Sequence, residues 1–268
     1  MTDFAPLDID MIEAGLDTSL VANKILLYKA TSSTNDVAWE YASNRDNNGL
    51  CIFAEQQHAG RGRRGNKWLS SPGAGILCSI LLLDMDDAGE MLTLAAAVAV
   101  AETISERLGR EAKIKWPNDI FLNGRKVAGL LVESRPGRGV VDYVLGIGIN
   151  CHQDRAFFEN AQLDNPATSL DIETNSTVDR NTLACDLLNT LDRRLNVMQT
   201  DTDSIIAGWK AAAGLLGHHV VVEHNRRRFA GNCTGIDPAR GMVLQLDSGG
   251  VRAFPAAQTT ILKQSTCP

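Results

Sequence analysis

The spacing of hydrophobic residues divides the chain into two parts that differ in secondary structure. Up to about residue 213, apolar runs short enough for strands alternate with longer segments whose apolar residues recur at helical spacing. Strands are predicted at residues 24–29, 50–55, 76–83, 112–116, 120–122, 126–133 and 140–150. Helices are predicted after the capping residues 32–35 and at residues 90–108, 181–199 and 202–213. Residues 151–180 are polar and predict irregular structure.

After residue 214 the pattern becomes one of short strands only. They are predicted at residues 219–223, 228–235, 242–247, 251–254 and 258–262, with turns at 224–225, 237–238 and 247–250. Such closely spaced short strands are typical of a small barrel. We therefore expect an acidic leader over residues 1–23 with one or two helical turns, an α/β domain over 24–213 and a small β domain over 214–268.

Composition and charge exclude some classes of protein. The net charge is −6 and the pI is about 5.4, which argues against a protein whose whole surface binds nucleic acid. The six cysteines are scattered through apolar segments without the spacing of a zinc site, so buried free thiols are expected. The N-terminus lacks the pattern of a signal peptide, and the apolar run at 91–101 is too short to span a bilayer. A cytoplasmic protein is the simplest interpretation.

Residues 60–68 (GRGRRGNKW) are the most informative segment. Four cations, Arg61, Arg63, Arg64 and Lys67, are interleaved with glycines. Glycines let backbone N–H groups approach a ligand, and guanidinium groups match carboxylate or phosphate oxygens. A solvated basic loop with affinity for RNA would have the same composition. Because the loop lies between two predicted strands rather than in a tail, a ligand with several anionic groups is the favoured interpretation.

Residues 126–133 follow Asn123-Gly124, a strong signal for a β-hairpin. Strand alternation predicts that Lys126 shares a face with Ala128 and Leu130. A lysine among small and apolar residues is unusual unless it meets an anion. A lysine at the start of a strand whose ammonium group reaches water is an equally good interpretation of this segment alone.

Two further segments offer ligand contacts at the predicted sheet. Residues 115–119 (KWPND) end a strand with Asn118 and Asp119, although this is also an ordinary turn sequence. In the strand that ends at residue 150, Gly146, Gly148 and Asn150 share the face opposite the apolar residues. A ligand could lie flat over these glycines, or a helix could pack closely on them.

Together these segments resemble the biotin protein ligases. The sequences SSTN at 32–35, GRGRRG at 60–65 with Trp68, KWPND at 115–119, KVAGLLVE at 126–133 and GIGIN at 146–150 occur in the order and spacing of that family. The resemblance is strong over residues 28–150, and GRGRRG combined with KWPND is its most specific part. It implies an α+β fold, with a mixed sheet and flanking helices followed by a small SH3-like barrel.

The resemblance also implies a reaction and its residues. ATP and biotin are the substrates, Mg²⁺ is the cofactor, and biotinyl-5′-AMP is the intermediate from which biotin passes to a carrier-protein lysine. Biotin contacts are implied for Ser33, Thr34, Gln57, Gly60, Arg61, Lys126, Gly129 and Gly148. Contacts to ATP or the adenylate are implied for Arg63, Arg64, Trp68, Asn118, Asp119, Lys126 and Asn150. Catalytic roles are expected for Lys126, Arg61, Arg63 and Asp119, whereas the ligands of the metal are not assigned.

The implied partner is a biotin carboxyl carrier protein, a subunit of acetyl-CoA carboxylase or of another biotin-dependent carboxylase. The leader before residue 24 is too short for the DNA-binding domain of some family members, so no DNA partner is expected, and none is expected in a membrane. A homodimer is compatible with the sequence. The alternatives are a lipoate or octanoate transferase of the same fold, and a non-catalytic RNA-binding protein that uses residues 61–67 and 226–228.

Overall fold

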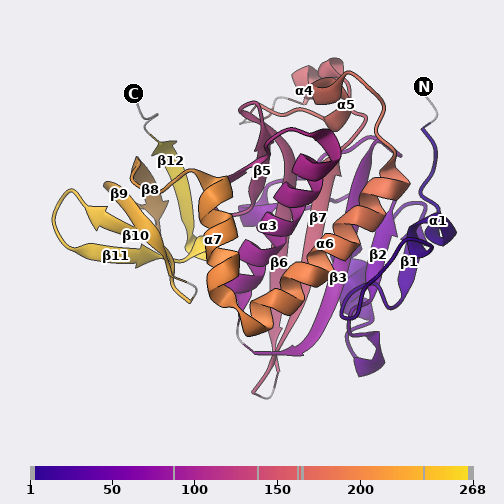
Figure 1. Ribbon diagram of the computed structural model, residues 1–268, viewed down its shortest axis with the longest axis horizontal. Helices are drawn as coiled ribbons and strands as arrows, with labels where there is room; N and C mark the ends of the chain where they lie inside the picture. Colours follow the sequence, from indigo (N-terminus) through magenta and orange to yellow (C-terminus); the bar gives the residue numbers. More distant parts are fainter. Residues whose placement is uncertain are drawn as a thin grey trace.

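The computed structural model describes residues 4–86, 88–137, 139–161, 163, 166–237 and 239–264 (Figure 1). The strands of the larger sheet are β1 (Ile25–Tyr28), β2 (Cys51–Ala54), β3 (Gly75–Met85), β4 (Lys113–Lys115), β5 (Asp119–Leu122), β6 (Arg125–Pro136) and β7 (Val141–Asn150). Those of the smaller sheet are β8 (His219–His224), β9 (Arg227–Asp237), β10 (Gly241–Leu246), β11 (Val251–Phe254) and β12 (Thr259–Gln264). The helices are α1 (Ile9–Glu13), α2 (Thr34–Glu40), α3 (Gly89–Leu108), α4 (Arg155–Asn160), α5 (Leu170–Thr174), α6 (Arg180–Thr200) and α7 (Thr202–Ala213).

The larger sheet is mixed and lies between two layers of helix. Its strand order is β1-β2-β3-β7-β6-β5-β4, in which β1 and β2 are parallel and the other neighbours are antiparallel. Helices α3 and α6 lie side by side over one face, with α7 beside α3 (Figure 1). The short helix α2 packs against β2, β3 and β7. The mixed sheet with flanking helices confirms the predicted α+β class.

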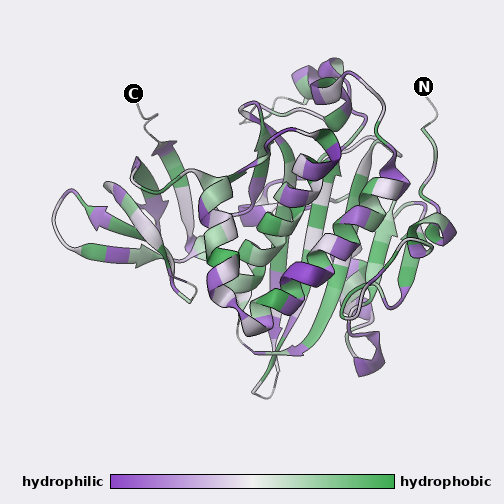
Figure 2. Cartoon of the chain, in the orientation of Figure 1, coloured by the Kyte–Doolittle hydropathy of each residue, from purple (hydrophilic) through white to green (hydrophobic). Residues whose placement is uncertain are grey.

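The hydrophobic core is split by this sheet. On the α3 and α6 side, alternate residues of β7 such as Leu145, Ile147 and Ile149 are buried with the apolar faces of the helices. Figure 2 shows the strands of the larger sheet as largely hydrophobic, whereas α6 carries hydrophilic segments between hydrophobic ones. A smaller cluster between α2 and the opposite face includes Trp39 and Val144. Beyond Val144 that face carries glycines, which leaves room above the sheet for the site described below.

The smaller sheet confirms the five strands predicted after residue 214. It is antiparallel with the order β11-β10-β9-β8-β12, and it follows α7 along the chain (Figure 1). Its likeness to an SH3 barrel and the boundaries at residues 23 and 213 stay predictions. The predicted turn at 237–238 includes Pro238, which lies outside the described residues.

Two segments are more ordered than their composition indicates. Residues 151–180 contain α4 and α5, where Asp154 and Ser169 cap the helices by accepting hydrogen bonds from backbone N–H groups. In the predicted leader, α1 forms the expected helical turn, but Leu7, Ile12 and Val21 are buried in the main core. Along the described part of the chain, no helix is both long and apolar enough to cross a membrane.

Candidate active site

A cavity opens on the glycine-bearing face of the larger sheet, beneath residues 60–68. Its lining comes from the start of α2, the loop between β2 and β3, the ends of β4 and β5, strands β6 and β7, and β12. The predicted site residues that line it are Ser33, Thr34, Gln57, Arg61, Arg63, Arg64, Trp68, Asn118, Asp119, Lys126, Gly129 and Gly148. The predicted residues from Ser33 to Gly148 thus lie around one cavity, although they come from separate sequence motifs.

Strand β6 places Lys126 differently from the prediction. Ile120 pairs with Ala128 and Phe121 with Lys126, so Val127 is an extra residue without a partner on β5. This β-bulge breaks the alternation of side chains. Ala128 and Leu130 face the buried core, whereas Lys126 lies with Gly129 on the cavity side. The expectation that Lys126 shares a face with Ala128 and Leu130 was wrong, because strict alternation assumes an unbroken ladder.

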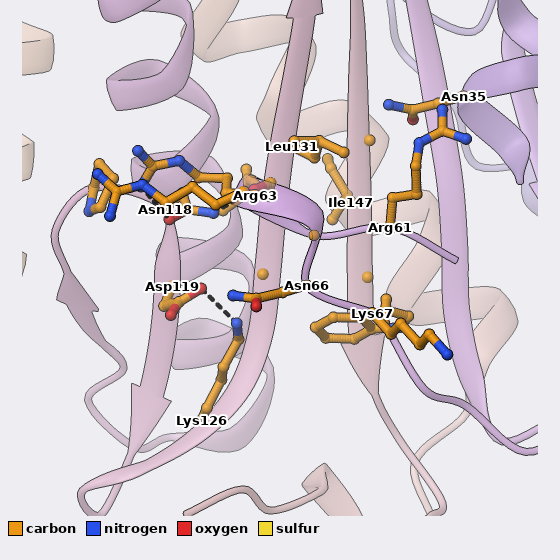
Figure 3. A pocket seen from close by; sticks show the side chains of 18 of the residues that line it. Asn35, Arg61, Arg63, Asn66, Lys67, Asn118, Asp119, Lys126, Leu131 and Ile147 are labelled. Atoms are coloured by element: carbon orange, nitrogen blue, oxygen red, sulfur yellow. Dashed lines mark hydrogen bonds and ion pairs between the residues drawn. The ribbon is translucent and has the colours of Figure 1, made fainter. Parts of the chain in front are cut away.

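The side chains of Lys126 and Asp119 meet at the rim of the cavity. The distance from Lys126 Nζ to Asp119 Oδ1 is 2.6 Å, and Asn66 of the overlying loop lies beside them (Figure 3). The neighbouring Asn118 is held by a hydrogen bond from its amide to the carbonyl of Leu130. Its other atom, Oδ1, accepts from Arg63 Nη1 at 3.2 Å. One lysine, one carboxylate and one guanidinium therefore converge at the carboxyl-terminal end of the KWPND segment.

The three arginines of the loop hold it to different elements. Arg61 makes a two-pronged ion pair with Asp36 of α2, at 2.7 and 2.9 Å, and a second pair with Glu133 of β6 at 3.2 Å. Arg63 Nη2 donates to the carbonyl of Ala256, and Arg64 Nη1 donates to Thr260 Oγ1. Arg61 therefore ties the loop to the larger sheet, and the other two arginines tie it to the smaller one.

The smaller sheet contributes lining residues that the sequence did not predict. Thr260 and Ile261 of β12 also line the cavity, where Thr260 contacts the loop through Arg64. Local sequence gives no sign of this contact, because almost 200 residues separate Arg64 from Thr260. The several arginines of the loop indicate that hydrogen-bond acceptors lie nearby, but the sequence does not show which residues supply them.

A chain of buried polar groups lies at the inner end of the cavity. Gln57 Oε1 accepts from the backbone N–H and the hydroxyl of Thr34, at 2.7 and 3.1 Å. The hydroxyl of Ser79 connects Thr34 Oγ1 to Asn35 Oδ1, at 2.7 and 2.6 Å. Asn35 Nδ2 is buried and has no hydrogen-bond partner among the described residues. A buried donor left in this way favours a ligand that brings an acceptor.

The glycines of β7 let two other groups approach the sheet closely, of which one is the helix that the sequence offered as an interpretation; a ligand lying over them stays a prediction. A Cβ atom on Gly146 would lie 2.4 Å from Asn35 Oδ1, so this glycine allows α2 to pack closely. A Cβ atom on Gly148 would lie 2.5 Å from the indole ring of Trp68, which covers Gly148 and Gly129. Trp68 Nε1 is also buried without a partner among the described residues. The ring therefore rests on the surface where a flat ligand was expected.

Two predicted residues lie outside the cavity lining. Gly60 supports the loop, because a Cβ atom there would lie 2.7 Å from the carbonyl of Trp68. The amide of Asn150 donates to the carbonyl of Thr168 at 3.0 Å, and Asn150 lines a neighbouring pocket on the other side of Trp68. Lys126 and Trp68 border both pockets.

The cavity is strongly cationic although the whole chain is acidic. Among the described residues that line it, six are lysine or arginine and one, Asp119, is a carboxylate. Burial, followed by the charge of Arg64, lowers the pKa of Arg63 below its ordinary value. The half-buried Arg63 bonds to two neutral groups, so an anion would stabilise its charge. Arg61 differs, because Asp36 raises its pKa and already neutralises it.

The residues present fit a magnesium ion only in company with a ligand. Within the described ranges, no group of three or more His, Cys, Asp or Glu side chains could hold a metal ion. Mg²⁺ in nucleotide sites is usually held by one or two carboxylates, waters and the phosphates. Asp119 and the oxygen of Asn118 are suitable protein donors for such a shared site.

Comparisons with known proteins agree on one family. Residues 27–150 match the biotin/lipoate A/B protein ligase family. The bifunctional ligase/repressor BirA of Bacillus subtilis is 32% identical over 250 residues, which cover 91% of this chain and 76% of that protein. The biotin–[acetyl-CoA-carboxylase] ligase of Paracoccus denitrificans is 34% identical over 239 residues, 85% of this chain and 96% of that protein.

A solved structure shares the fold. The biotin protein ligase from Aquifex aeolicus in complex with biotin and ATP superposes with a TM-score of 0.76. The match covers 91% of this chain and 100% of that chain at 23% identity. At this identity the likeness shows that the two chains have a common fold.

Proposed function

This chain belongs to the biotin protein ligases of the biotin/lipoate A/B protein ligase family, and we propose that the cavity under residues 60–68 is where it activates biotin with ATP. The enzyme is an ATP-dependent ligase that proceeds through biotinyl-5′-AMP. The observation that carries the assignment to this cavity is its charge: six cationic side chains and one carboxylate surround a space bordered by buried polar groups. Such a lining suits a carboxylate that meets a triphosphate.

The first half-reaction joins two anions. An oxygen of the biotin carboxylate attacks the α-phosphorus of ATP, and the bond to the β-phosphate oxygen breaks, so that pyrophosphate leaves. Both reactants are negative, so fixed cations that face the reacting atoms lower the barrier. In the second half-reaction, a carrier lysine amine attacks the carbonyl carbon of the adenylate. AMP leaves and an amide forms.

Lys126 is proposed to stand between the biotin carboxylate and the α-phosphate. Its ammonium group lies over the Trp68 ring at 5.6 Å from the centroid and is held by Asp119. Because it borders both pockets, a bound anion in either can reach it. Asp119 orients the ammonium group, and Arg63, whose two hydrogen bonds go to neutral groups, is proposed to bind the phosphate of the adenylate.

The polar chain at the inner end is proposed to bind the ureido ring of biotin. That ring offers one carbonyl acceptor and two N–H donors. Asn35 Nδ2 is a free donor for the carbonyl, and the hydroxyls of Ser33 and Thr34 and the amide of Gln57 are within the same lining. Gly129 and Gly148 would form the floor once the Trp68 ring moves aside.

We propose that the loop moves when the substrates bind, because the available space is small. The cavity has a volume of about 230 Å³, below the roughly 300–1,000 Å³ of typical small-molecule sites. The ring of Trp68 fills part of it, and the loop is held by side-chain contacts of exposed or half-buried arginines. Displacing Trp68 would open the floor and join the cavity to the pocket that contains Asn150.

The remaining assignments are also proposals. Mg²⁺ would be held by Asp119, Asn118 and the phosphates, where it would neutralise charge on the leaving pyrophosphate. The acceptor would be a biotin carboxyl carrier protein, since relatives are named for acetyl-CoA carboxylase. Residues 24–213 would form the catalytic domain and residues 214–268 an SH3-like domain. Five buried free cysteines among the described residues fit a reducing compartment such as the cytoplasm.

The substrate is tested by pyrophosphate release from Mg-ATP with biotin, lipoate, octanoate or no acid. We expect release with biotin alone. Release with lipoate or octanoate instead would assign the cavity to the other branch of the family. No release with any acid would remove the catalytic assignment and leave the basic loop as a binding surface.

A further inference from the structure

Glu173 is a buried carboxylate that the reaction as described does not use. It lies on α5, and its side chain is 2% exposed. Its two oxygens accept hydrogen bonds from Asn123 Nδ2, Arg125 Nη2 and Thr168 Oγ1, at 2.6, 2.7 and 2.6 Å. Three strong donors on one buried carboxylate form a rigid junction, since each bond involves an ionised acceptor.

The three donors lie close to Lys126, two of them just before it in the chain and one on the segment that pairs with it. Asn123 forms the turn of the β5–β6 hairpin, and Arg125 immediately precedes Lys126. Thr168 belongs to a segment that runs beside Lys126. Glu173 therefore joins both stretches of backbone that border the lysine.

The backbone of Lys126 is clamped by that neighbouring segment. The N–H of Lys126 donates to the carbonyl of Pro166 at 2.9 Å, and the N–H of Thr168 donates to the carbonyl of Lys126 at 2.8 Å. The carbonyl of Thr168 accepts from Asn150 Nδ2 at 3.0 Å. These bonds fix the base of a side chain that emerges beside a β-bulge, where the strand ladder alone does not fix it.

Glu173 is ionised in this setting. Burial would raise its pKa, but hydrogen bonds from Thr168 and Asn123 and the charge of Arg125 outweigh burial, so the pKa is lowered. Loss of the negative charge would leave Arg125 partly buried without its counter-ion and would free the hairpin from residues 166–168.

We propose that Glu173 is a positioning residue for adenylation, which holds Lys126 in place by tying Asn123 and Arg125 to Thr168. The proposal rests on the assignment of Lys126 to the reacting centre. Glu173 does not line either pocket that Lys126 borders, so it acts through the backbone rather than on the substrate. A small displacement of the Lys126 ammonium group would weaken its contact with the transition state. The proposed contacts between the protein and the ureido ring of biotin would be unchanged.

The first test is Glu173→Gln, in which one acceptor oxygen becomes a donor amide. We expect kcat for biotin-dependent pyrophosphate release to fall about 10- to 100-fold, the cost of a misplaced catalytic group, with little change in the KM of biotin. Thr168→Val, which removes one of the three donors, should change kcat in the same direction with a smaller effect on folding. The matched control is Glu102→Gln, which breaks a partly buried carboxylate–arginine pair with Arg194 between α3 and α6, far from the cavity lining.

The second test combines Glu173→Gln with Lys126→Met. If Glu173 acts through Lys126, the double variant is no slower than Lys126→Met alone, because the group being positioned is absent. A full further loss in the double variant would overturn the proposal, as would a normal kcat for Glu173→Gln in an active enzyme. Failure of the unmodified enzyme to release pyrophosphate with biotin would instead overturn the proposed function.

Discussion

Lys126 Nζ lies 2.6 Å from Asp119 Oδ1, and the two residues reach each other across a hairpin that carries a β-bulge at Val127. Without the extra residue, strand alternation would turn Lys126 towards the core that contains Ala128. The bulge therefore converts a lysine at the start of a strand into a group that faces a cationic cavity. Bulges with this effect are common next to active sites.

Lys126→Met should remove most of the adenylation activity. The change keeps most of the unbranched apolar stem but removes the charge, and with it the cation–π contact with Trp68. We expect kcat for pyrophosphate release to fall by about 10²–10³, the usual cost of deleting one group that stabilises a transition-state charge. The effect is measured as the rate of pyrophosphate release at saturating biotin. A rate equal to that of the unmodified enzyme within error would exclude Lys126 from the reacting centre.

Arg63→Gly should let the adenylate escape. The guanidinium bridges Asn118 and the carbonyl of Ala256, so its loss removes two of the contacts that hold the loop and a cation from the phosphate. We expect a faster release of biotinyl-5′-AMP, measured as the off-rate of labelled adenylate after gel filtration. Arg240→Gly, at an exposed arginine paired with Asp237, is the control. An off-rate that Arg63→Gly leaves unchanged would count against this role.

Gly148→Ala should raise the KM of biotin. A Cβ atom at this position would lie 2.5 Å from the Trp68 ring and would occupy the proposed floor. Overpacking of this kind costs about 1–3 kcal/mol, which corresponds to a rise in KM of roughly 5- to 150-fold. Gly235→Ala in β9 has open space around the added methyl group and serves as the control. An unchanged KM would show that biotin does not lie over Gly148.

Glu173 should contribute stability that depends on pH. Its pKa in the folded protein is lowered from the ordinary 4.5, so its contribution is present above that pH and is lost as the pH falls towards the folded pKa. At pH 7, Glu173→Gln should reduce the free energy of unfolding by about 1–3 kcal/mol, the cost of a disrupted buried polar network. Urea unfolding from pH 7 to pH 3 should show the difference between the two proteins shrinking below about pH 4.5. A difference that stays constant over this range would contradict the assignment.

The sequence predicted the parts of this structure that depend on local chemistry. The left-handed conformations of Asn123 and Gly124 form the predicted hairpin turn, and the alternation of Leu145, Ile147 and Ile149 with glycines predicted which face of β7 is buried. The glycine-rich spacing of residues 60–68 likewise predicted a loop that approaches other groups closely. Each of these features is decided within a few residues.

Features that depend on distant partners were not predictable in this way. The bulge at Val127 is a property of two strands, and the contact of Arg64 with Thr260 joins the two sheets. Asp36 and Glu133 hold Arg61 in the cavity lining, and neither carboxylate is near it in sequence, whereas its expected contact with biotin stays a prediction. The helices at 155–160 and 170–174 were missed because their capping residues act in a segment with little hydrophobic periodicity.

Activation of biotin at this cavity is tested most directly by the mass of a biotin carboxyl carrier domain incubated with the protein, biotin and Mg-ATP. We expect a mass increase of one biotinyl group on a single carrier lysine, and its loss when Lys126→Met replaces the unmodified enzyme. An unmodified carrier in the presence of the intact protein, or full labelling by Lys126→Met, would contradict the assignment of the reaction to this site.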